Sequence, residues 1–294
     1  MTRHPLFGIF LAAFGTLVLT PDTLFMRWSE LSGFSMVAWR GLLMGSAMLM
    51  AWVIFSRDRR GDLAALLTGF GLTIVVCQFF NATLFGLGIS VAPVAVVLFG
   101  LATVPVFSAL LAWIILGEPT RRATWIAIAA VMTGIAIAVF GGEEGDVGFD
   151  LNALYGALFG LGTALVLALN FVVMRRRPQL PILLVIGVGA VLAGITALSL
   201  AGPVAMVDGE IWAIAVTGLV ILPVSFFTLS VASRYTHASN VSLLLLLETV
   251  LGPAWVWLGT GEAPTPMMIL GGGIVVTSLA VYILWTGRRT ARRG

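Results

Sequence analysis

"VPVFSALLAWIILGE", residues 104–118, aligns with "ETVLGPAWVWLGTGE", residues 248–262, when the chain is shifted by 144 residues. The matching positions are Val106 and Val250, Trp113 and Trp257, Gly117-Glu118 and Gly261-Glu262, and, one inserted residue later, Pro119-Thr120 and Pro264-Thr265. Gly15-Thr16 matches Gly162-Thr163 at a slightly different offset near the start of each half. A fixed period of this kind indicates an internal duplication, which decides the architecture.

The composition places the duplicated chain in a membrane. Of its 294 residues, 60% are hydrophobic and 10% charged, and the mean hydropathy is +1.08. Soluble domains have about 45–50% apolar and about 25% charged residues. Apolar segments recur along the whole chain without a polar block long enough to fold by itself, so we predict an all-α integral membrane protein.

A spanning helix needs about 20 mostly apolar residues. That window predicts ten segments: 5–26, 33–55, 63–88, 92–116, 122–140, 151–173, 180–202, 210–233, 238–260 and 265–286. The apolar run 63–116 is too long for one crossing, so a tight turn is required near residues 89–92, beside Pro93. The N-terminal run resembles a signal peptide but has no small-x-small cleavage site before the second segment, so it is interpreted as a retained helix.

Loop charges give an independent test of the count. Cytoplasmic loops collect basic residues, and with a cytoplasmic N-terminus the even-numbered loops, the start and the C-terminal tail hold 14 of the 16 arginines. The other loops carry acids, such as Glu143 and Glu144. A missed helix would invert this pattern, so the sequence predicts ten helices with both termini in the cytoplasm.

Five helices per half mean that the second copy enters the membrane upside down. Inverted repeats are typical of transporters that expose a central site to either side in turn. The expected organisation is a first repeat at 1–142, an external linker at 143–150, an inverted second repeat at 151–287 and a basic cytoplasmic tail at 288–294.

These features carry a family resemblance over essentially the whole chain. Two inverted halves, each with Gly-Glu and a proline between its fourth and fifth helices, resemble the drug/metabolite transporter superfamily of EamA type. The "WR" at Trp39-Arg40 and the run "RYTHASNVSLLLLLETV" into the ninth segment are similar to it too. The family often has Glu-Pro where this chain has Glu248-Thr249. Within the superfamily, the Trp- and Phe-rich chain is most similar to bacterial amino-acid exporters of the YddG group.

Several function classes find no support in the sequence. One cysteine, Cys77, and two dispersed histidines suit neither a disulfide framework nor a metal cluster. The positive charge comes from arginines in short loops and marks topology, so nucleic acid is not expected as a partner. Without lysine the chain has no Walker-type loop for ATP. We expect no cofactor, no metal and no obligate protein partner, only a small-molecule substrate and the lipid bilayer.

Glu248 and Arg40 are two charged residues that fall well inside predicted spans. A carboxylate at the bilayer centre costs at least ~2.5–3.5 kcal/mol and is usually functional. Glu248 either ties helices together or lines the transport path, where it binds a proton or a substrate amino group. Arg40 lies seven residues, roughly 10 Å, below the outer end of its segment. Two interpretations of Arg40 stay open: a structural anchor to a helix end, headgroup or acid, and a contact with a substrate carboxylate.

Uncharged polar and aromatic side chains complete the candidate path. Gln78 and Asn81 share one helical face; they either orient a zwitterion or form interhelical hydrogen bonds. Weaker polar candidates are Thr16, Thr163 and Ser225, whose hydroxyls can bond their own backbone. The deeper aromatic candidates, which line a cavity or simply pack, are Trp39, Phe79, Phe80 and Phe99.

The sequence therefore predicts a secondary transporter that exports small metabolites across a bacterial inner membrane by alternating access. Amino acids over a broad range are the expected substrates, neutral and aromatic ones above all. The alternatives are export of drugs or other metabolites and, less favoured, an intramembrane enzyme, for which no nucleophile–base pair or metal motif is found.

Overall fold

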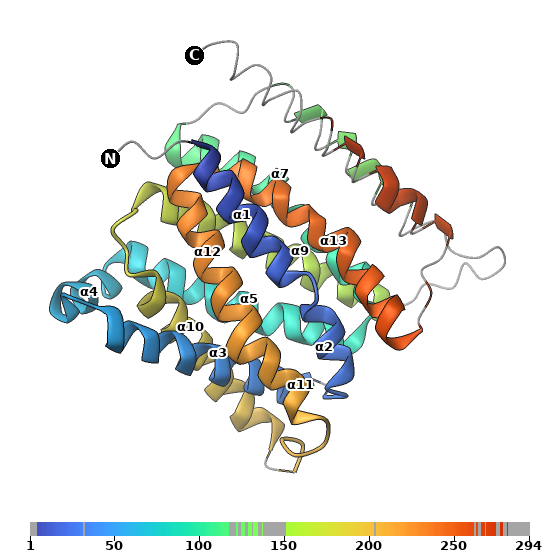
Figure 1. Ribbon diagram of the computed structural model, residues 1–294, viewed down its shortest axis with the longest axis horizontal. Helices are drawn as coiled ribbons and strands as arrows, with labels where there is room; N and C mark the ends of the chain where they lie inside the picture. Colours follow the sequence, from blue (N-terminus) through green and yellow to red (C-terminus); the bar gives the residue numbers. More distant parts are fainter. Residues whose placement is uncertain are drawn as a thin grey trace.

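The computed structural model describes residues 5–31, 33–117, 151–202 and 204–261, and scattered residues within 122–137 and 263–281. Every regular element in this described part is a helix, and the long helices lie side by side in a bundle (Figure 1). In chain order they are α1 (Pro5–Leu19), α2 (Asp22–Trp28), α3 (Gly33–Phe55), α4 (Arg59–Leu66), α5 (Gly69–Val91), α6 (Val94–Leu101), α7 (Val104–Leu111), the π-helical η1 (Ala112–Leu116), α9 (Leu151–Arg176), α10 (Ile182–Ala201), α11 (Ile211–Val216), the π-helical η2 (Thr217–Ile221), α12 (Leu222–Tyr235) and α13 (Ala238–Thr260).

Eight stretches of the described residues are long and apolar enough to cross a membrane. They are Phe7–Trp28, Gly33–Phe55, Gly69–Val91, Val94–Leu116, Leu154–Arg176, Ile182–Ala201, Ile211–Tyr235 and Asn240–Thr260. Each coincides with a predicted segment to within six residues at either end. The predicted fifth and tenth segments, 122–140 and 265–286, lie largely outside the described residues.

Two local features set the ends of the third span. The expected turn before the fourth span is confirmed: α5 ends at Val91, Ala92 is extended, and Pro93 precedes α6. At the other end, the segment predicted to begin at 63 starts later. Residues 59–66 form the exposed helix α4, and α5 begins after Thr68, whose hydroxyl accepts a hydrogen bond from the Gly71 amide. This N-cap satisfies an amide that has no partner within the helix.

Prolines coincide with interruptions inside three spans. The first span breaks at Thr20–Pro21, so that α2 begins at Asp22. The fourth breaks at Ala102–Thr103, just before Pro105, and the seventh passes through η2 just before Pro223. Proline has no amide hydrogen to donate, which frees a carbonyl in the preceding turn. The first of these breaks turns an acidic side chain into the bundle.

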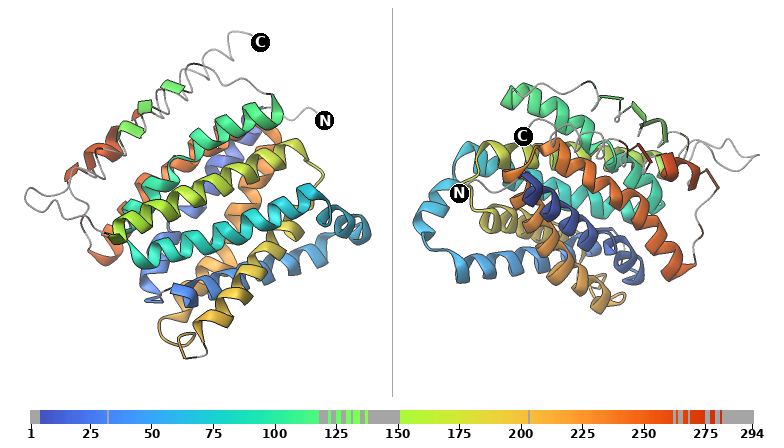
Figure 2. Two further views of the ribbon diagram at one scale, coloured as in Figure 1. Left: turned by 180° about the vertical axis from the view of Figure 1, so that it is seen from behind. Right: turned by 45° about the horizontal axis from the view of Figure 1, so that its top comes forward.

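Close helix crossings rely on glycines. α3 packs on α10, as both views of Figure 2 show in blue and gold. A Cβ placed on Gly41 would lie 2.7 Å from the Ala190 carbonyl oxygen, and one on Gly45 would lie 2.7 Å from the Val191 amide. On α9, a Cβ on Gly160 would come within 2.3 Å of the Val97 carbonyl oxygen. The missing side chains at these glycines therefore allow the helices to approach closely.

The helix contacts follow a reciprocal pattern. α1, the first helix, packs against α12 and α13 of the other half (Figure 1). α9, the first helix of that half, packs against α5 and α6. At the end of α2, the Trp28 indole donates to the Gly259 carbonyl at 3.3 Å. At the end of α9, the Arg176 guanidinium donates to the Ile115 carbonyl. The two acceptor residues are 144 positions apart, the same spacing that aligns the duplicated sequences.

Candidate functional site

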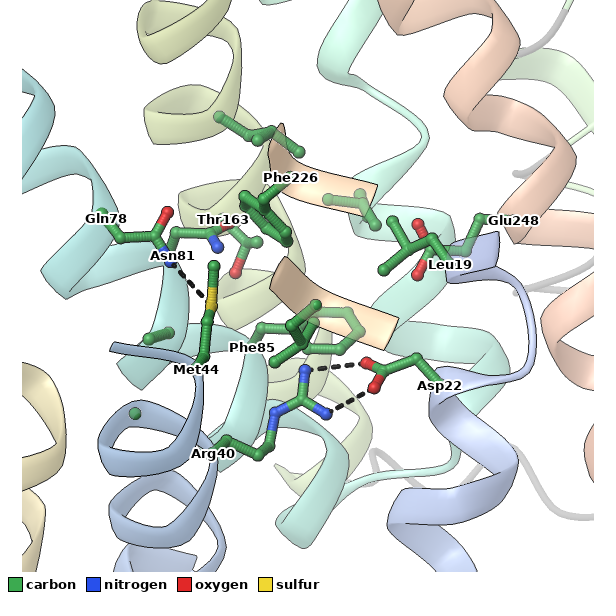
Figure 3. A pocket seen from close by; sticks show the side chains of 15 residues that line it. Leu19, Asp22, Arg40, Met44, Gln78, Asn81, Phe85, Thr163, Phe226 and Glu248 are labelled. Carbon is green, nitrogen blue, oxygen red and sulfur yellow. Dashed lines mark hydrogen bonds and ion pairs between the residues drawn. The ribbon is translucent and has the colours of Figure 1, made fainter. Parts of the chain in front are cut away.

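A pocket lies midway along the spans, between helices of both halves (Figure 3). The cavity volume is about 40 Å³, and apolar atoms make up most of the surface. The lining residues are Leu19, Asp22, Arg40, Gly41, Met44, Gln78, Asn81, Ala82, Phe85, Leu101, Thr163, Leu167, Leu222, Phe226 and Glu248. A cavity of this size holds a few water molecules, so a larger ligand requires the lining side chains to move apart. The few polar groups of the lining are those that would fix its orientation.

Asp22 and Arg40 form an ion pair in this lining. Arg40 Nη1 donates to Asp22 Oδ1 at 2.8 Å, and Nη2 donates to Oδ2 at 2.7 Å. The side chains are 7% and 1% exposed, and the Phe85 ring lies 5.7 Å from the guanidinium carbon. Bidentate geometry is the strongest form of this interaction, and it satisfies both groups where water is scarce. Arg40 is therefore anchored to an acid, one of the interpretations left open by the sequence.

Glu248 lies near the middle of α13 and projects into the same pocket (Figure 3). Its side chain does not face lipid, since the residue is 2% exposed. Its Oε2 is buried and has no hydrogen-bond partner. A buried polar atom without a partner is rare in native proteins and requires an explanation, such as a ligand, a proton or water.

Two amides and a hydroxyl share the pocket with these charges. Gln78 is 1% exposed; its Nε2 lies 3.8 Å from Met44 Sδ, and its Oε1 is buried without a partner. Asn81, one turn further along α5, lines the pocket on the same helical face. Thr163 Oγ1 donates to the Phe159 carbonyl of its own helix at 2.7 Å. The structure thus brings together five residues predicted from sequence: Glu248, Gln78, Asn81, Arg40 and Thr163.

The other predicted candidates lie outside the pocket lining. Trp39 Nε1 donates to the Met206 carbonyl at 2.8 Å, and Ser225 Oγ donates to the Ile221 carbonyl of its own span at 2.6 Å. Thr16 is fully buried, and its Oγ1 has no partner. The aromatic candidates outside the lining are Phe79, which is partly buried, Phe80, which is 45% exposed, and Phe99, which is 4% exposed.

Sequence reasoning missed Asp22, the partner of Arg40. The signal was available, because Asp22 falls within the predicted first segment and an acid inside a span is a default candidate for function. Phe85, Met44 and Phe226 were missed for a different reason. They are ordinary apolar residues of apolar helices, and nothing in their spacing marks them as facing a cavity.

A bundle of apolar spans around a pocket is the architecture of a multi-pass membrane protein. The sequence profile of the EamA-like transporter family matches residues 6–140 and, a second time, residues 154–284. The chain therefore belongs to the EamA-like transporter family, within the drug/metabolite transporter superfamily.

Two individual proteins are similar to the chain over most of its length. The "Uncharacterized transporter YdfC" of Bacillus subtilis (strain 168) is 24% identical over 241 residues, which are 80% of this chain and 77% of that protein. A solved crystal structure shares the fold at a TM-score of 0.75 and 16% identity, covering 96% of this chain and 98% of the other. The family and the Bacillus relative are both transporters, which agrees with a small-molecule substrate.

Proposed function

We propose that this EamA-family protein is a secondary transporter that exports small metabolites, amino acids foremost, across the bacterial inner membrane. Two inverted five-helix halves, 1–142 and 151–287, expose the central pocket to either side in turn. The linker 143–150 lies outside, and both termini, including the tail 288–294, lie in the cytoplasm. The observation that carries the proposal is the buried pocket midway along the spans, lined by residues of both halves.

Three observations support the inverted halves. The family profile matches the chain twice, over 6–140 and 154–284. α1 packs against α12 and α13 as α9 packs against α5 and α6. The carbonyls that accept the Trp28 and Arg176 side chains are 144 residues apart. Two copies related by a two-fold axis in the membrane plane would produce each of these correspondences.

The pocket chemistry supports amino acids as the first substrates to test. Glu248 offers an acceptor for an amino group, and the amides of Gln78 and Asn81 can orient a polar head. Phe85 and Phe226 provide an aromatic surface for a hydrophobic side chain. The same surface fits lipophilic drugs and other metabolites, which remain the second candidate.

A counterflow panel in proteoliposomes tests this substrate class. Vesicles loaded with unlabelled compound are given labelled amino acids, nucleosides, sugars or a lipophilic cation. We expect exchange of neutral and aromatic amino acids, and empty liposomes provide the background. Exchange of the lipophilic cation alone would favour the drug-export alternative, and exchange of sugars or nucleosides alone would reject the amino-acid assignment.

Energy coupling is tested through Glu248, which we propose carries a coupled proton. Glu248→Gln preserves the shape of the side chain but cannot exchange a proton, so it should abolish the dependence of uptake on a pH gradient. Glu210→Gln changes an exposed acid outside the pocket and is the matched control. Uptake by Glu248→Gln that still follows the gradient would exclude this role.

The membrane topology is tested by single-cysteine labelling in a Cys77→Ala background. A membrane-impermeant maleimide should label Gly145→Cys in cells whose outer membrane alone is permeabilised. It should label Thr290→Cys only after the inner membrane is opened as well. Labelling of both positions from the same side would contradict the proposed odd number of crossings between them.

A further inference from the structure

We infer that the pocket recognises its ligand by a protonated amine and does not read a ligand carboxylate through Arg40. This rests on the proposed function, because it names the ligand class of the same site. The charged chemistry of the lining is simple: Asp22, Arg40 and Glu248 are its ionisable residues. The first two neutralise each other, so Glu248 sets the net charge that a ligand meets.

Arg40, the cationic residue of the pocket lining, already forms an ion pair with Asp22. Both terminal nitrogens of Arg40 donate to Asp22, at 2.8 and 2.7 Å, and the Asp22 side chain is 1% exposed. Each of these nitrogens keeps a second N–H, but a ligand carboxylate placed there also meets the negative charge of Asp22. The pair therefore offers a ligand carboxylate little net positive charge.

Two buried acceptors of the lining have no partner. Glu248 Oε2 and Gln78 Oε1 are both buried and unpartnered, and both side chains point into the pocket from its two sides (Figure 3). The Thr163 hydroxyl already donates its hydrogen to the Phe159 carbonyl, so toward a ligand it can act only as an acceptor. An ammonium group brings three N–H donors and a positive charge. It satisfies Glu248 directly, and a second donor on the ligand reaches the acceptors of Gln78 or Thr163.

The rest of the lining defines the ligand's body. Leu167, Leu222 and Phe226 come from the second half, and Leu101 and Phe85 from the first. Apolar and aromatic side chains of this kind bind an alkyl or aryl group. The ligand class is thus a primary amine with an apolar or aromatic body. Amino acids belong to it through their amino group, and their decarboxylated analogues belong to it equally.

Three matched probes separate the two charged groups of an amino acid: 2-phenylethylamine, phenylalanine and 3-phenylpropionate. Binding to the purified full-length protein in detergent micelles, by isothermal titration calorimetry, avoids leakage of the neutral amine through lipid. We expect phenylethylamine to bind at least as tightly as phenylalanine, and phenylpropionate to bind more weakly by about tenfold or more. Equal binding of phenylpropionate, or a preference of about tenfold for phenylalanine over the amine, would overturn the inference.

Two variants assign the effect to residues. Glu248→Gln should weaken amine binding by about tenfold or more, because a charge-assisted bond is lost, whereas the control Glu210→Gln should leave it unchanged. Asp22→Asn releases Arg40 and should raise the affinity for phenylpropionate. If Asp22→Asn does not fold, the probe series and Glu248→Gln still decide the matter. Unchanged amine binding by Glu248→Gln counts against the inference.

Failure of this inference can be distinguished from failure of the proposed function. Amino acids that exchange in proteoliposomes while the amine fails to bind would reject this inference and leave amino-acid transport in place. Absence of exchange for the whole panel, together with absence of binding for the three probes, would reject both.

Discussion

The two halves of the chain contribute corresponding positions to the pocket but different chemistry. At the 144-residue spacing, Gln78 corresponds to Leu222 and Ala82 to Phe226, and all four line the pocket. One half supplies an amide and a small residue where the other supplies a leucine and a phenyl ring. Glu248 corresponds to Val104, which is fully buried. The backbone positions are repeated, and the side chains have diverged.

For the ligand proposed above, this difference favours one orientation in the pocket. Asp22, Arg40 and the amides face it from the first half, with Phe226 and Leu222 across the pocket. An ideally symmetric pocket would accept a ligand equally well either way round. Substitutions at corresponding positions therefore test which interactions both halves can make and which only one half makes.

The largest effect is expected at the Asp22–Arg40 ion pair of the first half. Arg40→Leu leaves Asp22 buried and unpaired, and we expect a loss of about 3–5 kcal/mol in the free energy of unfolding. The double variant Arg40→Leu with Asp22→Leu should recover most of that loss. Unfolding in detergent micelles measures both, with the exposed Arg57→Leu as control. A double variant as unstable as the single one would show that the pair is not the cause.

The next effect concerns Val104, the counterpart of Glu248. Val104→Glu places an acid in a fully buried position that does not line the pocket. We expect a loss of about 2.5–3.5 kcal/mol, the cost of an acid at the centre of a span. Val104→Ala separates lost packing from added charge and should cost less. If Val104→Glu is as stable as the unmodified chain, the first half tolerates a buried acid at this position as the second half does at Glu248.

A smaller effect is expected at Gln78 and Leu222. Gln78→Leu removes an unpartnered acceptor, so stability should rise or stay within about 1 kcal/mol, while phenylethylamine binds more weakly. Leu222→Gln adds an amide to the other half and should not restore that binding in the double variant. Calorimetry and unfolding of the same preparations separate the two effects. Full restoration would mean that the two sides of the pocket are interchangeable.

The smallest effect is expected at Ser225, the counterpart of Asn81. Its hydroxyl donates to the Ile221 carbonyl of its own span and lies outside the pocket lining. Ser225→Ala should change stability by about 1 kcal/mol or less and leave exchange in proteoliposomes unchanged. A clear loss of exchange by Ser225→Ala alone would place Ser225 in the transport path after all.

Sequence reasoning located the spans but not their rotation about their own axes. Length and hydropathy placed all eight described spans, and Pro93 marked the turn between two of them. Which side of each helix faces the pocket is harder to predict. Lipid and protein interior are equally apolar, so the usual periodicity of polar residues on the outer face is lost. Phe80 and Phe85 show the consequence: both are phenylalanines of α5, yet one is 45% exposed and the other lines the pocket.

Polar residues were predicted better, because their burial has to be compensated. Glu248, Gln78 and Asn81 were found from their depth and spacing, and the structure places all three in one lining. The partner of Arg40 was not found, although it lies in the preceding span. Pairing between spans depends on the break at Pro21, which begins α2 at Asp22 and which hydropathy does not register.

The Asp22–Arg40 pair also bears on how the protein enters its membrane. An arginine well inside a span adds about 2.5–3.5 kcal/mol to the cost of insertion. Its acid lies 18 residues earlier, in the span that is synthesised first. The counter-ion is therefore already synthesised when the second span inserts, and the two spans can enter the lipid together as a hairpin.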